Sequence, residues 1–247
     1  MLGASMSTTD EGEITMNMSE VMVGDAGVKT TPYERRFNPY DFNGGTNVVL
    51  AGPDFAIAAG CTRMSTGYEI LSRDQTKLFN LTPNTVLTTA GCMSDVVTLR
   101  RMLDARLTQY KHQTNRDMST QSAAQLLGNT LYGRRFFPYY AFCMLAGLDD
   151  EGKGAVYGYD AVGSFKRDDY GAMGSGQKAI MPILDNLIGH KHRQDTDTPL
   201  TKEEAINIIK DVFVIATERD IYTGDNVEIS VITKDGTTTE TFELKHD

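Results

Sequence analysis

The residues that could do chemistry begin at Gly44-Gly45-Thr46, where a threonine hydroxyl follows two glycines at the start of a strand-like run. If the chain were cut before Thr46, the new terminal amine would lie beside that hydroxyl and could act as its base. Such a pair attacks amide bonds, so Thr46 is one candidate nucleophile. Gly45 has no side chain, and no chemistry is available for it to cut the preceding peptide bond.

Two short strands should position this triplet. Residues 46–52 are mostly β-branched and apolar, a Pro-Asp turn follows, and residues 55–61 form a second run of small residues. Ala58, Ala59 and Gly60 let another layer of the protein approach closely. The pattern predicts two paired strands that are packed tightly on both faces.

This arrangement resembles the proteasome beta-subunit family, in which a Gly-Thr bond is cut by its own threonine. Active members carry an Asp sixteen positions and a Lys thirty-two positions after the nucleophile, and counted from Gly45 these positions are Cys61 and Lys77. An Arg follows two residues after Cys61, as in the family's Asp-Ser-Arg. Counted from Thr46, neither position keeps the family's residue. Gly45 is therefore the position that aligns with the nucleophile.

The outer parts of the family's site are retained. Ser175 lies in a Gly-Ser-Gly sequence that matches a Ser-Gly-Ser turn, and Asp220 lies in Arg-Asp-Ile-Tyr-Thr-Gly-Asp, which matches Arg-Asp-Ala-Tyr-Ser-Gly-Gly. The resemblance implies that Lys77, Ser175 and Asp220 are vestigial, and that Gly45 and Cys61 replace the nucleophile and a carboxylate. It implies no catalytic residue, no cofactor and no metal site in this chain.

Each of these positions also has an ordinary structural interpretation. A buried cysteine such as Cys61 usually behaves as a small hydrophobe. Lys77 could have a lowered pKa in a pocket, but without its partners it is a structural strut or a solvated side chain. Ser175 and Asp220 have side chains that often bond to nearby backbone groups. We expect structural roles for all four.

Longer blocks extend the resemblance over most of the chain, and they are similar to the non-catalytic type-1 group of the family. These blocks are residues 36–40, 42–46, 134–140, 147–157 and 218–225. Several blocks in the right order are far more specific than a lone motif. The resemblance begins near Arg36 and implies an α+β fold, a four-layer αββα sandwich of the N-terminal-nucleophile hydrolase type.

For function, the resemblance implies a structural subunit in the sixth position of the proteasome beta ring, acting in ubiquitin-dependent protein degradation. Its expected partners are beta subunits of the same and the opposite ring, alpha-ring subunits, and polypeptide substrates in the chamber. Its surface would border the substrate pocket of the adjacent chymotrypsin-like subunit. Two alternatives stay open: an active threonine hydrolase that uses Thr46, and a free-standing intracellular scaffold.

Composition excludes some classes of function. The chain has 247 residues, 40% of them hydrophobic and 23% charged, and a formal net charge of -9. Phosphate contacts need clustered Lys and Arg, so a general nucleic-acid binder is disfavoured, and two Arg-Arg pairs are too short to change this. Three widely spaced cysteines favour reduced thiols in a cytoplasmic and nuclear protein. No apolar run is long enough for a membrane span, and no signal peptide is evident.

Residues 1–35 are rich in Ser, Thr, Gly, Met and acids and show no sustained periodicity, which predicts a flexible tail before a domain at 36–247. The resemblance implies a propeptide that a neighbouring active subunit trims near Arg36. A tail that is never removed is the alternative.

Helical spacing and turn residues predict the remaining elements. Ser94 is expected to cap a first helix with apolar residues Val96, Leu99, Leu103, Leu107 and Tyr110, and a second carries Ala123, Leu126, Leu127 and Leu131. A third helix follows Gly176, and Thr201 with Glu204 predicts a capping box for a fourth. Strands are expected at 85–91, 140–146 and 155–159, with a final hairpin of 227–233 and 239–244. This order predicts two sheets face to face, with helices on both outer faces.

Two further segments allow more than one interpretation. His190 and His192 lack other ligands at a recognised spacing, so we predict a solvated loop rather than a metal site. The aromatic-rich residues 136–140 are either an entry to the core or a subunit contact, and the pattern leaves both open.

Overall fold

The computed structural model describes residues 6–8, 14–16, 38–190 and 199–246. The chain forms two units, Met1–Pro39 and Tyr40–Asp247. In the first unit, β1 (Met6–Thr8) pairs with β2 (Ile14–Met16) in antiparallel fashion. The rest of the predicted tail, like His192, lies outside the described residues, so the flexibility of residues 1–35, their removal and a domain start at Arg36 stay predictions.

Within the described residues, the second unit is built on two five-stranded sheets. One has the order β12-β3-β4-β13-β14, formed by Tyr170–Gly174, Thr46–Ala51, Phe55–Cys61, Asn226–Thr233 and Gly236–Glu243. The other has the order β11-β10-β9-β8-β7, formed by Phe165–Asp168, Gly154–Tyr159, Ala141–Leu148, Thr85–Gly91 and Leu78–Thr82. A separate hairpin pairs β5 (Met64–Thr66) with β6 (Glu69–Ser72).

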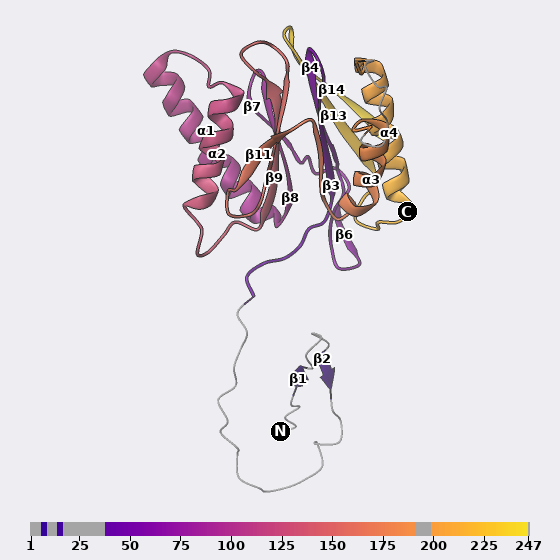
Figure 1. The fold of residues 1–247 in the computed structure, drawn as a ribbon. Helices are drawn as coiled ribbons and strands as arrows, with labels where there is room; N and C mark the ends of the chain where they lie inside the picture. Colours follow the sequence, from indigo (N-terminus) through magenta and orange to yellow (C-terminus); the bar gives the residue numbers. More distant parts are fainter. Residues whose placement is uncertain (1–5, 9–13, 17–37, 191–198, 247) are drawn as a thin grey trace, which may run out of the picture. The chain divides into compact units, whose positions relative to one another are not determined.

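Helices cover the outer face of each sheet, and the four layers are visible in Figure 1. The pair α1 (Met93–Thr114) and α2 (Thr120–Tyr132) packs on the β7–β11 sheet. The pair α3 (Gln177–Leu187) and α4 (Lys202–Thr217) packs on the other sheet. This confirms the predicted αββα sandwich. No described helix is both long enough and apolar enough to cross a membrane.

Small residues allow the two sheets to approach each other. Ala56, Ala58 and Ala146 lie in the cluster between the sheets, whereas Ala59, on the opposite face of β4, packs toward α3 and α4. At Gly60 an added Cβ would lie 2.5 Å from Asn47 Oδ1. The predicted tight packing on both faces of this strand is therefore confirmed.

The start of α1 differs from the prediction. Its N-cap is Cys92, without a side-chain cap, and Ser94 lies inside the first turn. The Asn43 side chain caps the helix from a distant part of the sequence, because its Oδ1 accepts a hydrogen bond from Met93 N at 2.8 Å. Capping by a residue so far away leaves no local sequence signal.

Besides β1 and β2, the short strands β5, β6, β11 and β12 were also not predicted. They have three to five residues each, and most of their side chains are half-buried or exposed. Their sequences therefore lack the apolar alternation that identifies a strand. The last strand, β14, begins at Gly236, earlier than the predicted residue 239.

Candidate functional site

The site is centred on the two glycines before β3, both of which have left-handed φ angles, +70° for Gly44 and +89° for Gly45. An added Cβ at Gly45 would lie 2.3 Å from Lys77 Cε and 3.0 Å from its Nζ. The Lys77 side chain therefore occupies the space that a side chain at position 45 would need. Glycine fits both the backbone conformation and this close approach.

Lys77 is almost completely buried, with 1% of its surface exposed. Its Nζ donates hydrogen bonds to the carbonyl oxygens of Cys61, at 2.7 Å, and Arg63, at 2.6 Å. Burial lowers the pKa of Lys77 below its ordinary value, while nearby Cys61, Glu228 and Asp225 act in the opposite direction. Lys77 thus joins the end of β4 to the segment beyond it and is not a solvated side chain.

Cys61 is the last residue of β4, and its side chain is fully buried in the core beneath α3 and α4. Its Sγ accepts a hydrogen bond from Thr46 N at 3.3 Å. A thiol in this place fills space as a small hydrophobe would, and it supplies no carboxylate beside Lys77.

The Thr46 hydroxyl is enclosed by hydrogen bonds, and the residue is fully buried. Its Oγ1 accepts from Gly176 N at 2.8 Å and lies 2.7 Å from Thr223 Oγ1. Its nitrogen is a peptide N–H that donates to Cys61, so it offers no lone pair for a base. In the uncut chain, Thr46 thus has a hydrogen-bonded hydroxyl and no free amine beside it.

Asp220 accepts a second set of hydrogen bonds in the site. Its Oδ2 accepts hydrogen bonds from Ser175 Oγ and Thr223 Oγ1, both at 2.6 Å, and its Oδ1 accepts one from Tyr222 N at 3.1 Å. Ser175 N also donates to the Gly45 carbonyl at 3.1 Å. The fold therefore brings together residues from four distant segments around Gly45, as the predicted alignment requires.

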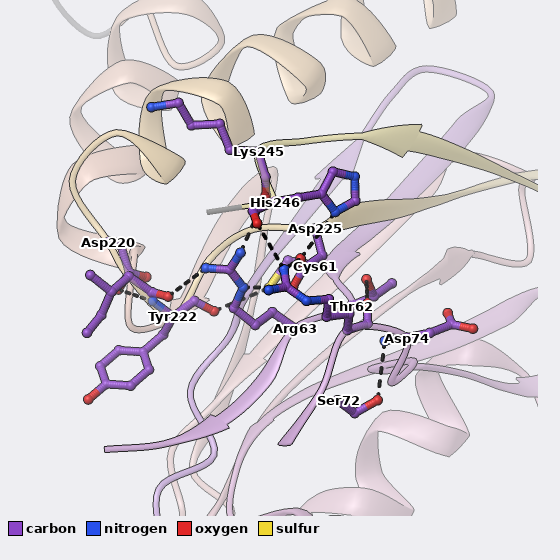
Figure 2. Close-up of polar contacts among 12 residues, drawn as sticks. Cys61, Thr62, Arg63, Ser72, Asp74, Asp220, Tyr222, Asp225, Lys245 and His246 are labelled. Atoms are coloured by element: carbon purple, nitrogen blue, oxygen red, sulfur yellow. Dashed lines mark hydrogen bonds and ion pairs between the residues drawn. The ribbon is translucent and has the colours of Figure 1, made fainter. Parts of the chain in front are cut away.

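A buried ion pair borders the site, and sequence reasoning missed it. Arg63 Nε lies 2.7 Å from Asp225 Oδ2, with side-chain exposures of 3% and 0%. Figure 2 shows the guanidinium between two segments: Arg63 Nη1 donates to the Ile221 carbonyl at 3.0 Å, and Nη2 donates to the Lys245 carbonyl at 3.4 Å. One arginine thus joins the loop after α4 to the C-terminal residues.

Two more groups lie beside the Asp225 carboxylate. Arg73 Nη1 contacts its Oδ1 and also donates to the His246 carbonyl at 3.2 Å, while His246 Nδ1 lies 3.4 Å from the same carboxylate. Burial alone would raise the pKa of Asp225, but hydrogen bonds from Arg63 and Arg73 lower it below its ordinary value. We call Arg63, Arg73, Asp225 and His246 the C-terminal clasp.

A family model described as a proteasome subunit matches residues 41–232, most of the chain. The chain belongs to the proteasome subunit family. It is 51% identical over 222 residues to proteasome subunit beta type-1 of Arabidopsis thaliana, and the matched region covers 88% of this chain and 100% of that protein. The beta type-1 subunit of Danio rerio is 48% identical over 219 residues, covering 88% and 92%. Proteasome subunit beta type-6 of Saccharomyces cerevisiae is 42% identical over 227 residues, covering 88% and 94%.

For this proteasome subunit, the predicted resemblance and fold type are confirmed. Gly45, Cys61, Lys77, Ser175 and Asp220 meet in one place in the structure, but their lack of a catalytic role stays a prediction. The clasp had one sequence signal: Asp225 stands where the matched Arg-Asp-Ala-Tyr-Ser-Gly-Gly run has a glycine. Its φ of +66° lies in the left-handed region, which aspartate adopts more readily than most other non-glycine residues. His190 is half-buried at the edge of the described residues.

Proposed function

We propose that this chain is a non-catalytic structural beta subunit of the proteasome core particle, of the type-1 kind. The observation that carries the proposal is the contact between Gly45 and Lys77: the aligned nucleophile position has no side chain, and the lysine occupies its space. A threonine hydrolase needs a hydroxyl, a base and a substrate carbonyl in one geometry. The described residues around Gly45 do not provide this set.

The alternative nucleophile, Thr46, is disfavoured by its surroundings. Its hydroxyl is held by Gly176 and Thr223, and its nitrogen is committed to Cys61. Cutting the Gly45–Thr46 bond would also separate Ser175 from its partner, the Gly45 carbonyl. An active site at Thr46 would require these contacts to be broken.

The partners follow from the family. As a proteasome subunit the chain assembles with other proteasome subunits, and we propose beta subunits of the same and the opposite ring and alpha-ring subunits as its neighbours. It would wall the chamber that holds polypeptide substrates and border the substrate pocket of the adjacent chymotrypsin-like subunit. We place it in the cytoplasm and nucleus, which the free, buried Cys61, Cys92 and Cys143 support.

Two measurements on the native complex test this function. The intact mass and N-terminal sequence of the chain should show either no cut or a start near residue 36. A threonine-directed covalent inhibitor applied to the purified complex should label other subunits and not this one. A start at Thr46 together with labelling of this chain would overturn the proposal in favour of an active hydrolase.

The size of the native assembly distinguishes a core-particle subunit from a free-standing scaffold. Size-exclusion chromatography of native material should place the chain in a very large hetero-oligomer. A monomer or a homo-oligomer would favour a free-standing scaffold over a core-particle subunit.

A further inference from the structure

The segment after α2 exposes three aromatic rings within six residues. The exposed fractions are 65% for Tyr132, 95% for Phe136 and 53% for Phe137. A single exposed apolar side chain is ordinary on a protein surface, but a local cluster of large ones indicates an interaction site. We call Tyr132, Arg134, Arg135, Phe136 and Phe137 the aromatic ridge.

The backbone of the ridge is held in consecutive turns. Arg134 N donates to the Leu131 carbonyl, Arg135 N to Tyr132 and Phe137 N to Arg134, at 3.0 to 3.1 Å. The ridge is also supported from behind, because the Tyr40 hydroxyl donates to the Pro138 carbonyl at 2.7 Å and its ring lies 5.9 Å from that of Phe137. A surface that is already ordered loses little conformational entropy on binding.

The two arginines of the ridge are stacked on aromatic rings. The Arg134 guanidinium lies 5.1 Å from the Tyr139 ring centroid, and that of Arg135 lies 5.9 Å from Phe136. Among the described residues, no carboxylate pairs with either arginine. Both positive charges are therefore available to a partner.

The ridge also belongs to a basic part of an acidic chain. Residues 93–135 contain seven Lys and Arg, three Asp and no Glu, whereas the whole chain has a formal net charge of -9. The α2 segment itself carries no charged side chain. Nothing next to the ridge in sequence therefore neutralises Arg134 and Arg135, and an acidic partner would complement them.

We propose that the aromatic ridge is a docking surface for an acidic surface of a neighbouring proteasome subunit. Phe136 enters an apolar pocket of that subunit, and Arg134 and Arg135 pair with carboxylates at the rim of the pocket. Aromatic and arginine side chains are the types that dominate the energy of protein interfaces, and paired charges fix the orientation of the partner. The inference rests on the proposed function, because it requires assembly with other subunits.

The test is competitive incorporation into the core particle. Tagged full-length chain is expressed beside the untagged wild type, and the fraction of each that enters the particle is measured on native gels. Arg134→Glu with Arg135→Glu, and separately Phe136→Ser, should each reduce incorporation at least tenfold. Arg134→Lys with Arg135→Lys should lose much less, because the charge is kept. Circular dichroism of each isolated variant checks that it is folded.

A matched control reverses two charges elsewhere. Lys153→Glu with Lys166→Glu makes the same change of charge at exposed positions on another part of the unit, and should leave incorporation near the wild-type level. Equal incorporation of the ridge variants and the wild type would overturn the ridge proposal while leaving the proposed function intact. Failure of the wild type itself to enter any multi-subunit particle would instead overturn the proposed function.

Two other occupants would each overturn the proposal. The first is a second copy of this chain, seen as a homodimer of the isolated wild type that Phe136→Ser abolishes. The second is nucleic acid, seen as binding of a fluorescent single-stranded oligonucleotide that Arg134→Glu with Arg135→Glu abolishes.

Discussion

At the scale of single residues, Gly45 and Lys77 form one interlocked arrangement. The glycine backbone turns through a left-handed conformation, and the lysine side chain fills the space beside it before reaching the carbonyls of Cys61 and Arg63. The lysine side chain can lie here because position 45 has no side chain, and the filled space in turn favours glycine at position 45. A change at either one should be detectable in the stability of the fold.

The first prediction concerns Gly45→Ala. We expect it to cost about 3 kcal/mol in the free energy of unfolding, because the strain of a left-handed residue adds to a clash with Lys77. The matched control is Gly67→Ala, where φ is also positive, at +56°, but nothing lies within 4 Å of the added methyl group. It should cost only about 1 kcal/mol. Equal losses in urea unfolding would show that Lys77 does not confine this position.

The second prediction concerns the buried amine. Lys77→Met should destabilise the chain by about 2–4 kcal/mol, because the carbonyls of Cys61 and Arg63 lose their donor. The pKa of Lys77 is lowered by folding, so the unfolded chain binds its proton more tightly. The contribution of Lys77 to stability should therefore rise with pH from its folded pKa up to the ordinary value of 10.5, whereas the raised pKa of Cys143 acts in the opposite direction in both proteins. Urea titrations of the two proteins across this range should show the stability of the wild type rising relative to that of Lys77→Met.

At the scale of elements, contacts between distant segments decide what local patterns leave open. The two-strand run, the apolar faces of the helices and the capping box of α4 were all predicted, and Thr201 and Glu204 make both bonds of that box. The start of α1 and the clasp were not, because Asn43 and Arg63 act across long stretches of sequence. Hydrophobic periodicity carries information about burial along one element. It carries none about which polar side chain will reach it from elsewhere.

The corrected cap of α1 gives a third prediction. Asn43→Ala should cost about 1–2 kcal/mol, because it removes the acceptor for Met93 N. Ser94→Ala is the control, and it should cost less than about 0.5 kcal/mol, because this exposed residue lies inside the first turn. Thermal unfolding of both variants measures the difference. A larger loss for Ser94→Ala would restore the cap that the sequence pattern suggested.

The clasp gives a fourth prediction. Asp225→Asn should destabilise the chain by about 3–5 kcal/mol at neutral pH, because the buried Arg63 loses its counter-charge. Asp149→Asn breaks an ion pair with the half-exposed Arg167 at the surface, and should destabilise the chain much less than Asp225→Asn does.

The same clasp predicts how the stability of the fold changes at acid pH. The folded pKa of Asp225 is below its ordinary value of 3.8, so its contribution is complete above 3.8 and is lost as the pH falls through the folded pKa. Asp225→Asn should lack this part of the acid-induced loss. If the variant and the wild type lost the same unfolding free energy between neutral and acid pH, the clasp would be excluded as a source of the acid sensitivity.

At the scale of the whole molecule, family membership and fold could be predicted from ordered sequence blocks, whereas the docking surfaces could not. The aromatic-rich residues 136–140 illustrate why. Tyr139 and the half-buried Tyr140 pack inward, while Phe136 points to solvent, although all belong to one run. Which side of such a run faces a partner depends on the turn that precedes it. The ridge variants described above test this assignment within the assembled particle.

The interlock of Gly45 and Lys77 also bears on how a side chain could be introduced at this position. A single substitution that placed a hydroxyl at position 45 would put it in space occupied by the lysine, with a thiol at Cys61 nearby. Engineering a working nucleophile here would therefore require several coordinated changes, and we expect the first of them alone to lower the stability of the fold.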